Sequence, residues 1–159
     1  MVSQNSEAVH RWHAAISGGP AECHAAIAEL CDPDVDFYPV RKFPEARPCH
    51  GVEEFAQFFT RFWEGFPNAK FTVQDVIEVA DDRVLSCGRL RAEGPGSGIA
   101  LEGAIYTCHW LRHGRFFRIE NHMTLKGALA ALGLVGETLT EAGLDATSPP
   151  PAGTRSSGE

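Results

Sequence analysis

Three polar side chains interrupt two apolar, strand-favouring runs between Ile105 and Thr124: Thr107, His109 and Asn121. His113-Gly114 separates the two runs, and its glycine supplies the positive φ that a tight hairpin turn needs. A histidine with an oriented partner can carry a proton near neutral pH, and an amide can orient a carbonyl or a hydroxyl. This hairpin is therefore the first place to look for proton-transfer chemistry on an oxygen-bearing molecule.

The length of the turn decides which of these side chains share a face. A three-residue loop with a bulge places Thr107, His109 and Asn121 together. A two-residue loop places Tyr106 on that face instead of His109. The face itself has two interpretations, because antiparallel sheets often keep one wet side: it lines a cavity, or it faces solvent.

Alternating runs of helix and strand signals give the order of the elements that position this hairpin. Hydrophobic periodicity and turn residues predict helices over 6–17, 20–31, 51–66 and 125–132, and strands over 35–40, 71–80, 83–92, 99–112 and 115–123. Runs of strands after runs of helices indicate an α+β fold, with the helices packed on one face of a mostly antiparallel sheet.

Apolar stripes on two of the helices converge on one face of the hairpin. The helix over 51–66 carries phenylalanines at three- and four-residue steps, and the first helix carries Trp12 and Ile16 on its inner stripe. We predict a pocket lined by both stripes and the hairpin: Trp12, Ile16, Tyr38, Phe55, Phe59, Phe62, Ile105, Thr107, His109, Phe117, Ile119 and Asn121.

Composition excludes several classes of protein. A net charge of −7 argues against nucleic-acid binding, and no apolar run is long enough to span a membrane. The N-terminus carries charges where a signal peptide would need an unbroken apolar region, so a cytoplasmic protein is the default expectation. We expect one domain over residues 1–146 and a disordered C-terminal tail over 147–159, where anchoring hydrophobic residues are missing.

The cysteines and histidines do not form a recognisable metal or disulfide pattern. The five cysteines include no CxxC pair, so buried reduced thiols are expected. His10 and His13 lie three residues apart on a predicted helix and could share a metal, but no third ligand follows at a suggestive spacing. We therefore expect neither a metal nor an organic cofactor.

Six segments, in this order and spacing, carry a family resemblance: VHRWHAAISGG, DPDVDFYPV, HGVEEFAQFF, DDRVLSCG, HGRFFRIENHM and ALAALGL. Over residues 6–134 the chain resembles the nuclear-transport-factor-2-like superfamily, and within it the SnoaL-like polyketide cyclase group. The resemblance implies a cone-shaped, curved sheet wrapped on three helices of the N-terminal half, an apolar pocket inside it, and often a dimer through the sheet.

The family's known catalytic residues are not retained at the matching positions. Ketosteroid isomerases, which share this fold, would need a Tyr and two Asp where this chain has Trp12, Tyr38 and Thr107. SnoaL-type cyclases would need a His at Thr107 and an Asp at Asn121. The carboxylates of limonene-epoxide-hydrolase-like members have no counterpart either. Any chemistry in this chain must therefore use a different set of side chains.

Two hypotheses of different class follow. In the first, the chain is a SnoaL-like enzyme that acts on a small, apolar, oxygen-bearing molecule by cofactor-free acid–base chemistry of cyclase, isomerase or hydrolase type. His109 would be the acid or base, with Tyr38 and Asn121 orienting a carbonyl; the match to the family puts Tyr38 at the pocket opening. In the second, the chain is a non-catalytic module that binds such a molecule. We predict the three-residue hairpin loop, because it fits the family's spacing of inward polar positions.

A homodimer is also predicted, through the outer face of the sheet. That face would carry a large aromatic surface for a small monomer, made of Tyr106, Cys108, Trp110, Phe116 and Arg118.

Overall fold

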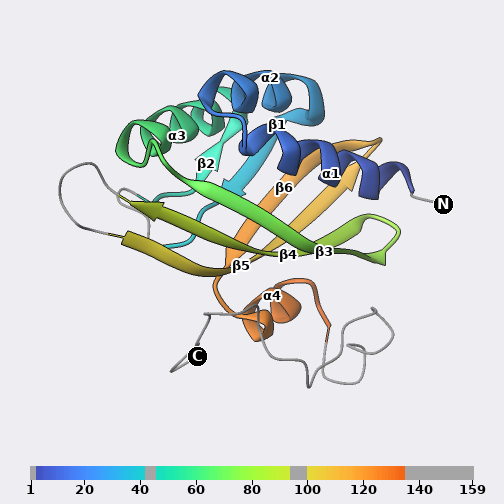
Figure 1. The fold of residues 1–159 in the computed structure, drawn as a ribbon. Coiled ribbons are helices and arrows are strands. Elements are labelled where there is room, and N and C mark those ends of the chain that lie inside the picture. Colours follow the sequence, from blue (N-terminus) through green and yellow to red (C-terminus); the bar gives the residue numbers. More distant parts are fainter. Residues whose placement is uncertain (1–2, 42–45, 94–99, 135–159) are drawn as a thin grey trace.

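The computed structural model describes residues 3–41, 46–93 and 100–134 (Figure 1). Its helices are α1 (Gln4–Ile16), α2 (Pro20–Leu30), α3 (Gly51–Gly65) and α4 (Leu125–Ala131). Its strands are β1 (Cys31–Tyr38), β2 (Cys49–His50), β3 (Lys70–Ala80), β4 (Arg83–Glu93), β5 (Ala100–Arg112) and β6 (Arg115–His122). The predicted tail and the domain boundary at residue 146 lie outside the described residues. No helix among the described residues is long and apolar enough to cross a membrane.

The strands form one curved, mixed sheet in the order β2-β1-β6-β5-β4-β3. β1 runs parallel to β6, and the other neighbouring pairs are antiparallel. The helices α1, α2 and α3 cover one face, and α4 lies on the other (Figure 1). The predicted α+β fold with helices on the concave face is confirmed.

Two boundaries near β1 differ from the prediction. The first strand was predicted over 35–40, but β1 starts at Cys31, directly after α2, and its pairing with β6 is irregular between Cys31 and Asp36. The strand β2 falls inside a predicted loop, and two residues are too few to show a periodic pattern.

The hairpin between β5 and β6 has a two-residue turn, so the predicted three-residue loop is wrong. His113 and Gly114 both have positive φ, 57° and 76°, as this turn requires. The bulge lies further along, at Phe117, which has no partner between the pairs Leu111↔Phe116 and Trp110↔Arg118.

The bulge restores the predicted faces despite the shorter turn. It shifts the register by one residue, so that Thr107 pairs with Asn121 and His109 with Ile119. Without it, Tyr106 would lie opposite Asn121. Thr107, His109 and Asn121 therefore share the inner face of the sheet.

An aromatic cluster joins the helices to the inner face. Phe55 and Phe59 on α3 pack against Trp12 of α1 with ring centroids 5.5 and 5.6 Å apart, and Phe37 of β1 stacks on Phe55 at 4.4 Å. Because Phe116 is also fully buried against Trp12, it belongs to the inner face and not to the predicted outer one.

The outer face is largely covered by α4. Leu85, Cys87, Ala104, Tyr106 and Cys108 pack against Ala128, Leu129 and Leu132 of that helix. Among the described residues, Met123 is the only exposed large hydrophobic side chain. The chain itself therefore covers much of the aromatic surface that motivated the dimer, and dimerisation stays a prediction.

Gly88 provides a test of how closely β3 and β4 approach each other. A Cβ at Gly88 would lie 2.2 Å from the carbonyl oxygen of Thr72, beside an irregular register between Val73 and Asp75. Gly88→Ala should lower the free energy of unfolding by about 1–3 kcal/mol, since backbone must move to admit the methyl group. Urea denaturation measures this change.

Gly103→Ala is the matched control, because a Cβ there meets nothing within 4 Å. It should leave stability within about 1 kcal/mol of the wild type. Equal effects of the two substitutions would contradict the close approach of the strands.

Candidate functional site

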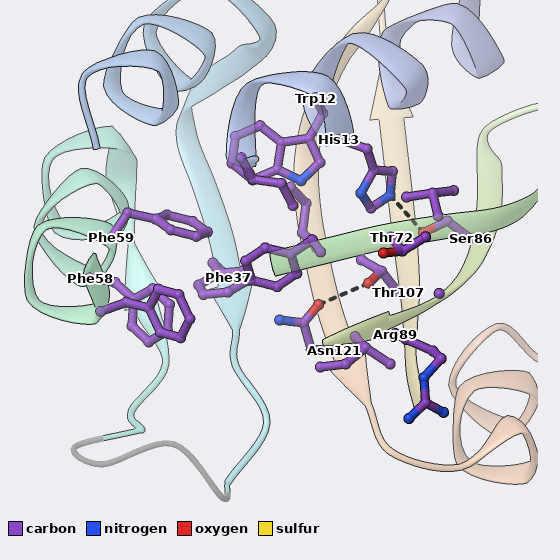
Figure 2. A pocket seen from close by; sticks show the side chains of 17 residues that line it. Trp12, His13, Phe37, Phe58, Phe59, Thr72, Ser86, Arg89, Thr107 and Asn121 are labelled. Carbon is purple, nitrogen blue, oxygen red and sulfur yellow. Dashed lines mark hydrogen bonds between the residues drawn. The ribbon is translucent and has the colours of Figure 1, made fainter. Parts of the chain in front are cut away.

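A cavity lies between α1, α3 and the inner face of the sheet (Figure 2). Aromatic rings form one side of it: Trp12, Phe37, Phe58, Phe59, Phe62 and Phe71. Its volume is about 40 Å³. That is space for a few water molecules, since one water needs roughly 10–15 Å³ on this measure. A ligand of ordinary metabolite size therefore enters only when lining side chains move.

Polar side chains form a row across the opposite side of the cavity. Ser86 of β4 pairs in register with Thr107 of β5, and Thr107 pairs with Asn121 of β6. His13 reaches the Ser86 end of this row from α1, as Figure 2 shows. We call His13, Ser86, Thr107 and Asn121 the polar row. Neighbouring strands thus bring residues far apart in sequence into one line facing the phenylalanines.

The Asn121 end of the row presents an amide N–H to the cavity. The hydroxyl of Thr107 donates to Oδ1 of Asn121 at 3.1 Å. This bond occupies the acceptor side of the amide, and in Figure 2 the amide nitrogen points toward the aromatic side. The Nδ2 group is therefore placed to donate a hydrogen bond to a ligand oxygen.

The His13 end of the row carries an unpaired ring nitrogen. Nε2 of His13 lies 2.8 Å from Oγ of Ser86, while Nδ1 is buried without a hydrogen-bond partner among the described residues. Burial, together with the smaller effects of His109 and His10 nearby, lowers the pKa of His13 to about 3. The imidazole is therefore neutral at physiological pH.

His109 lies behind the cavity and does not line it. Its side chain is fully buried, with Nδ1 3.0 Å from the carbonyl oxygen of Val84 and the ring packed against Phe116 and edge-on to His13. A carbonyl only accepts, so Nδ1 carries the proton and Nε2 is a bare acceptor, which has no partner among the described residues. Burial lowers the pKa of His109 to about 4, although the bond to Val84 raises it.

Eight of the predicted pocket residues line this cavity: Trp12, Ile16, Phe59, Phe62, Ile105, Thr107, Ile119 and Asn121. The other four lie elsewhere. His109 is behind it, Phe55 is buried against Phe37, and Phe117 is the bulge residue beside Arg112. Tyr38 lines a separate groove, which shares Asn121 with this cavity. The catalytic roles given to His109, Tyr38 and Asn121 stay predictions.

Sequence reasoning missed two members of the polar row, His13 and Ser86. The spacing of His13 places it on the apolar stripe of α1. This spacing predicts that the side chain points inward, but it predicts no functional role. Val84, Ser86 and Gly88 lie two residues apart and share the inner face of β4. Their small side chains could have predicted a cavity on this face. Arg89 has its guanidinium turned away from the aromatic side and paired with Glu102 at 3.4 Å (Figure 2).

The described residues contain no group of three or more His, Cys, Asp or Glu side chains arranged to hold a metal ion. His10 is exposed on the surface of α1, while His13 turns inward to Ser86. The pair that could have shared a metal is therefore divided between two environments.

The cysteines lie away from the cavity. Cys23, Cys31, Cys87 and Cys108 are buried and reduced, and Cys49 is partly buried. Burial raises the pKa of the Cys87 thiol to about 12 and that of Cys31 to about 12. Such thiols stay protonated, so they are poor nucleophiles.

Comparisons with known proteins match this architecture. The chain resembles three solved structures: a protein described as a SnoaL-like polyketide cyclase from Jannaschia sp. CCS1, IdmH, described as a polyketide cyclase, from Streptomyces antibioticus, and a protein of ketosteroid-isomerase-like fold from Catenulispora acidiphila. Identities are 21%, 22% and 19%, and TM-scores are 0.65, 0.60 and 0.63. The alignments cover 84%, 83% and 81% of this chain and 94%, 100% and 94% of the others.

At these identities the likeness establishes the fold alone. No curated protein matches the chain in sequence. A family model does match, for the SnoaL-like domain, over residues 9–119, which include the second half of α1, the aromatic helix α3 and most of the sheet. The chain belongs to the SnoaL-like domain family.

Proposed function

We propose that this chain is a SnoaL-like enzyme that performs carbonyl chemistry of isomerase or cyclase type on a small, largely apolar, oxygen-bearing substrate. The observation that carries the proposal is the polar row, which faces an aromatic wall across one cavity. Two structural relatives are described as polyketide cyclases, and that description supports the substrate class.

The two sides of the cavity bind different parts of the substrate. The phenylalanines and Trp12 bury the hydrocarbon part of the substrate, and each aromatic side chain offers a large apolar contact. The amide of Asn121 donates to the substrate's carbonyl oxygen. A hydrogen bond at that position strengthens as negative charge develops on the oxygen during enolisation, and this lowers the barrier.

His13 serves as the proton carrier in this proposal. When its Nε2–H donates to Ser86, the lone pair of Nδ1 takes the proton from the carbon next to the carbonyl. The electron pair of the broken C–H bond forms the enolate. The imidazolium then returns its proton to another carbon or to the oxygen, which completes an isomerisation.

The low pKa of His13 restricts the substrate. A base with a pKa of about 3 accepts protons weakly, so it suits a C–H group that is already acidic, such as one between two carbonyls. Catalysis then depends more on hydrogen bonds to the enolate oxygen than on the strength of the base.

A second candidate function is ligand binding without turnover. It is favoured by one observation: among the described residues, no Asp or Glu lines the cavity. The members of this fold considered above place a carboxylate in their active sites, and a cavity without one can still bind the same class of molecule.

Exchange of substrate protons separates the two functions. The chain is incubated with 1,3-cyclohexanedione or 2-indanone in D₂O, and NMR follows the loss of protons at the activated carbon. We expect exchange above the buffer rate, and a loss of about 10²–10⁴-fold of this acceleration in His13→Gln, the range typical of a general base.

Asn121→Asp and His10→Gln serve as comparisons. The exposed His10 should be dispensable, whereas a carboxylate at Asn121 would repel the developing enolate and slow exchange. Calorimetry with the same ketones reports binding independently. Binding without any acceleration in the wild type would remove the enzymatic proposal and leave the binding module.

His13 and His109, each with a buried ring nitrogen, also predict an acid-sensitive fold. Because both pKa values lie below the ordinary value of 6.5, the unfolded chain binds more protons than the folded one between about pH 4 and 6.5. Stability is therefore full above pH 6.5 and falls as the pH drops. At pH 5 each histidine should remove roughly 2 kcal/mol from the free energy of unfolding.

Urea denaturation at pH 7.5 and pH 5.0 measures this loss. His109→Gln should show a smaller difference between the two pH values than the wild type, because one titrating group is gone. His10→Gln should keep the whole difference. A wild-type stability that stays constant from pH 7.5 to 5.0 would show that neither histidine is held neutral by burial.

A further inference from the structure

A second hollow lies on the other side of Asn121. This rim groove is formed by residues 38–41, 46–48, 118 and 120–123, and its volume is about 680 Å³. Asn121 lines both the rim groove and the inner cavity. The groove is therefore a neighbour of the polar row, placed where the ends of β1 and β6 meet.

The lining of the rim groove is positively charged in a chain whose net charge is −7. It contains Arg41, Arg47 and Arg118, with one carboxylate, Glu120. Local positive charge of this kind attracts anions although the whole protein is acidic.

The single carboxylate is already occupied. Glu120 forms an ion pair with Arg118 on one side and lies 3.0 Å from Nε2 of His122 on the other, and its side chain is only 12% exposed. Among the residues that the structure describes, Glu120 is thus engaged by neighbours other than Arg41 and Arg47. Within the described residues, no carboxylate lies at ion-pair distance from either of these two arginines, and both are exposed.

Arg118 is held in place beside this pair. Its guanidinium lies 4.6 Å from the ring centroid of Tyr38 and 5.5 Å from that of Trp110. Stacking of this kind, together with the bonds from Nε and Nη2 to Glu120, fixes the plane of the guanidinium. The groove thus combines one oriented arginine with two adaptable ones.

We infer that the rim groove binds a carboxylate, and that the ligand of this protein is an organic acid whose apolar part enters the inner cavity past Asn121. The placement of the apolar part rests on the proposed function. Arginine matches a carboxylate through two parallel N–H···O bonds, so the groove selects acids over neutral molecules of the same shape. The carboxylate stays in the wet groove, where its desolvation costs little, while the aromatic wall buries the rest.

Two probes with the same carbon skeleton, one an anion and the other neutral, test this inference: 4-phenylbutyrate and 4-phenyl-1-butanol. Each has a ring for the cavity and a three-carbon arm long enough to reach outside it. Calorimetry at low salt should show the acid binding to the wild type about tenfold more tightly than the alcohol, as expected for charge-assisted contacts that remain partly exposed. This preference should shrink in 0.5 M NaCl, because salt screens exposed charges.

Arg41→Gln/Arg47→Gln is the test variant, since both side chains are exposed and their loss leaves the core intact. It should bind the two probes equally. Arg11→Gln/Arg112→Gln is the matched control: it removes the same charge from exposed arginines that line neither hollow, and it should keep the tenfold preference.

The outcomes separate the groove from the cavity. Equal binding of both probes to the wild type, or an equal loss of acid binding in both double variants, overturns the carboxylate site and leaves the proposed function standing. Acid binding that depends on Arg41 and Arg47, with no binding of the alcohol, supports the groove and contradicts the apolar cavity as the place of the ring. Failure of both probes to bind overturns the inference.

Discussion

The bulge at Phe117 is the constraint on which the site depends. Side chains alternate between the two faces of a strand, so a shift of one residue in the pairing of β5 with β6 would exchange the inner and outer sets. The two-residue turn at His113-Gly114 alone would align Tyr106 with Asn121. The extra residue at Phe117 aligns Thr107 instead, and through Thr107 it aligns Ser86 on the next strand. The place of Asn121 in the polar row is thus a consequence of one unpaired residue in β6.

Desolvation is the second constraint, and it acts on the two histidines. Both have a ring nitrogen buried without a partner in the described structure, an arrangement that costs free energy and is uncommon in cores. A core assembled for stability alone would place an apolar side chain at either position. At the edge of a cavity the same arrangement has a use, because an unpaired nitrogen of His13 can be satisfied by a ligand. A ligand that donates a hydrogen bond to this nitrogen would remove the free-energy cost of leaving it unpaired.

The sequence was sufficient for the fold because its signals are local. The phenylalanine spacing of α3, the glycine in the hairpin turn and the alternation of helix and strand signals each act over a few residues, and every predicted helix and strand exists within a few residues of its predicted bounds. The site was harder to predict because it depends on register. The prediction that Thr107 and Asn121 face inward is correct, although it assumed a three-residue turn. His109 was not, because residues on one strand face can still lie at different depths, and the ring of His109 sits under α1.

The position of Asn121 between the two hollows relates binding to chemistry. An acid held by the arginines of the rim groove would keep its charge outside the aromatic cavity, while Asn121 contacts the oxygen on the inner side. Positive charge at the rim raises the local concentration of anionic molecules and orients them with the apolar end inward. Inside, the neutral His13 and the amide avoid a fixed charge in an apolar cavity, which would be costly to desolvate. In the proposed function, charge at the entrance and neutral hydrogen-bonding groups within would thus separate recognition of the molecule from the handling of its carbonyl oxygen.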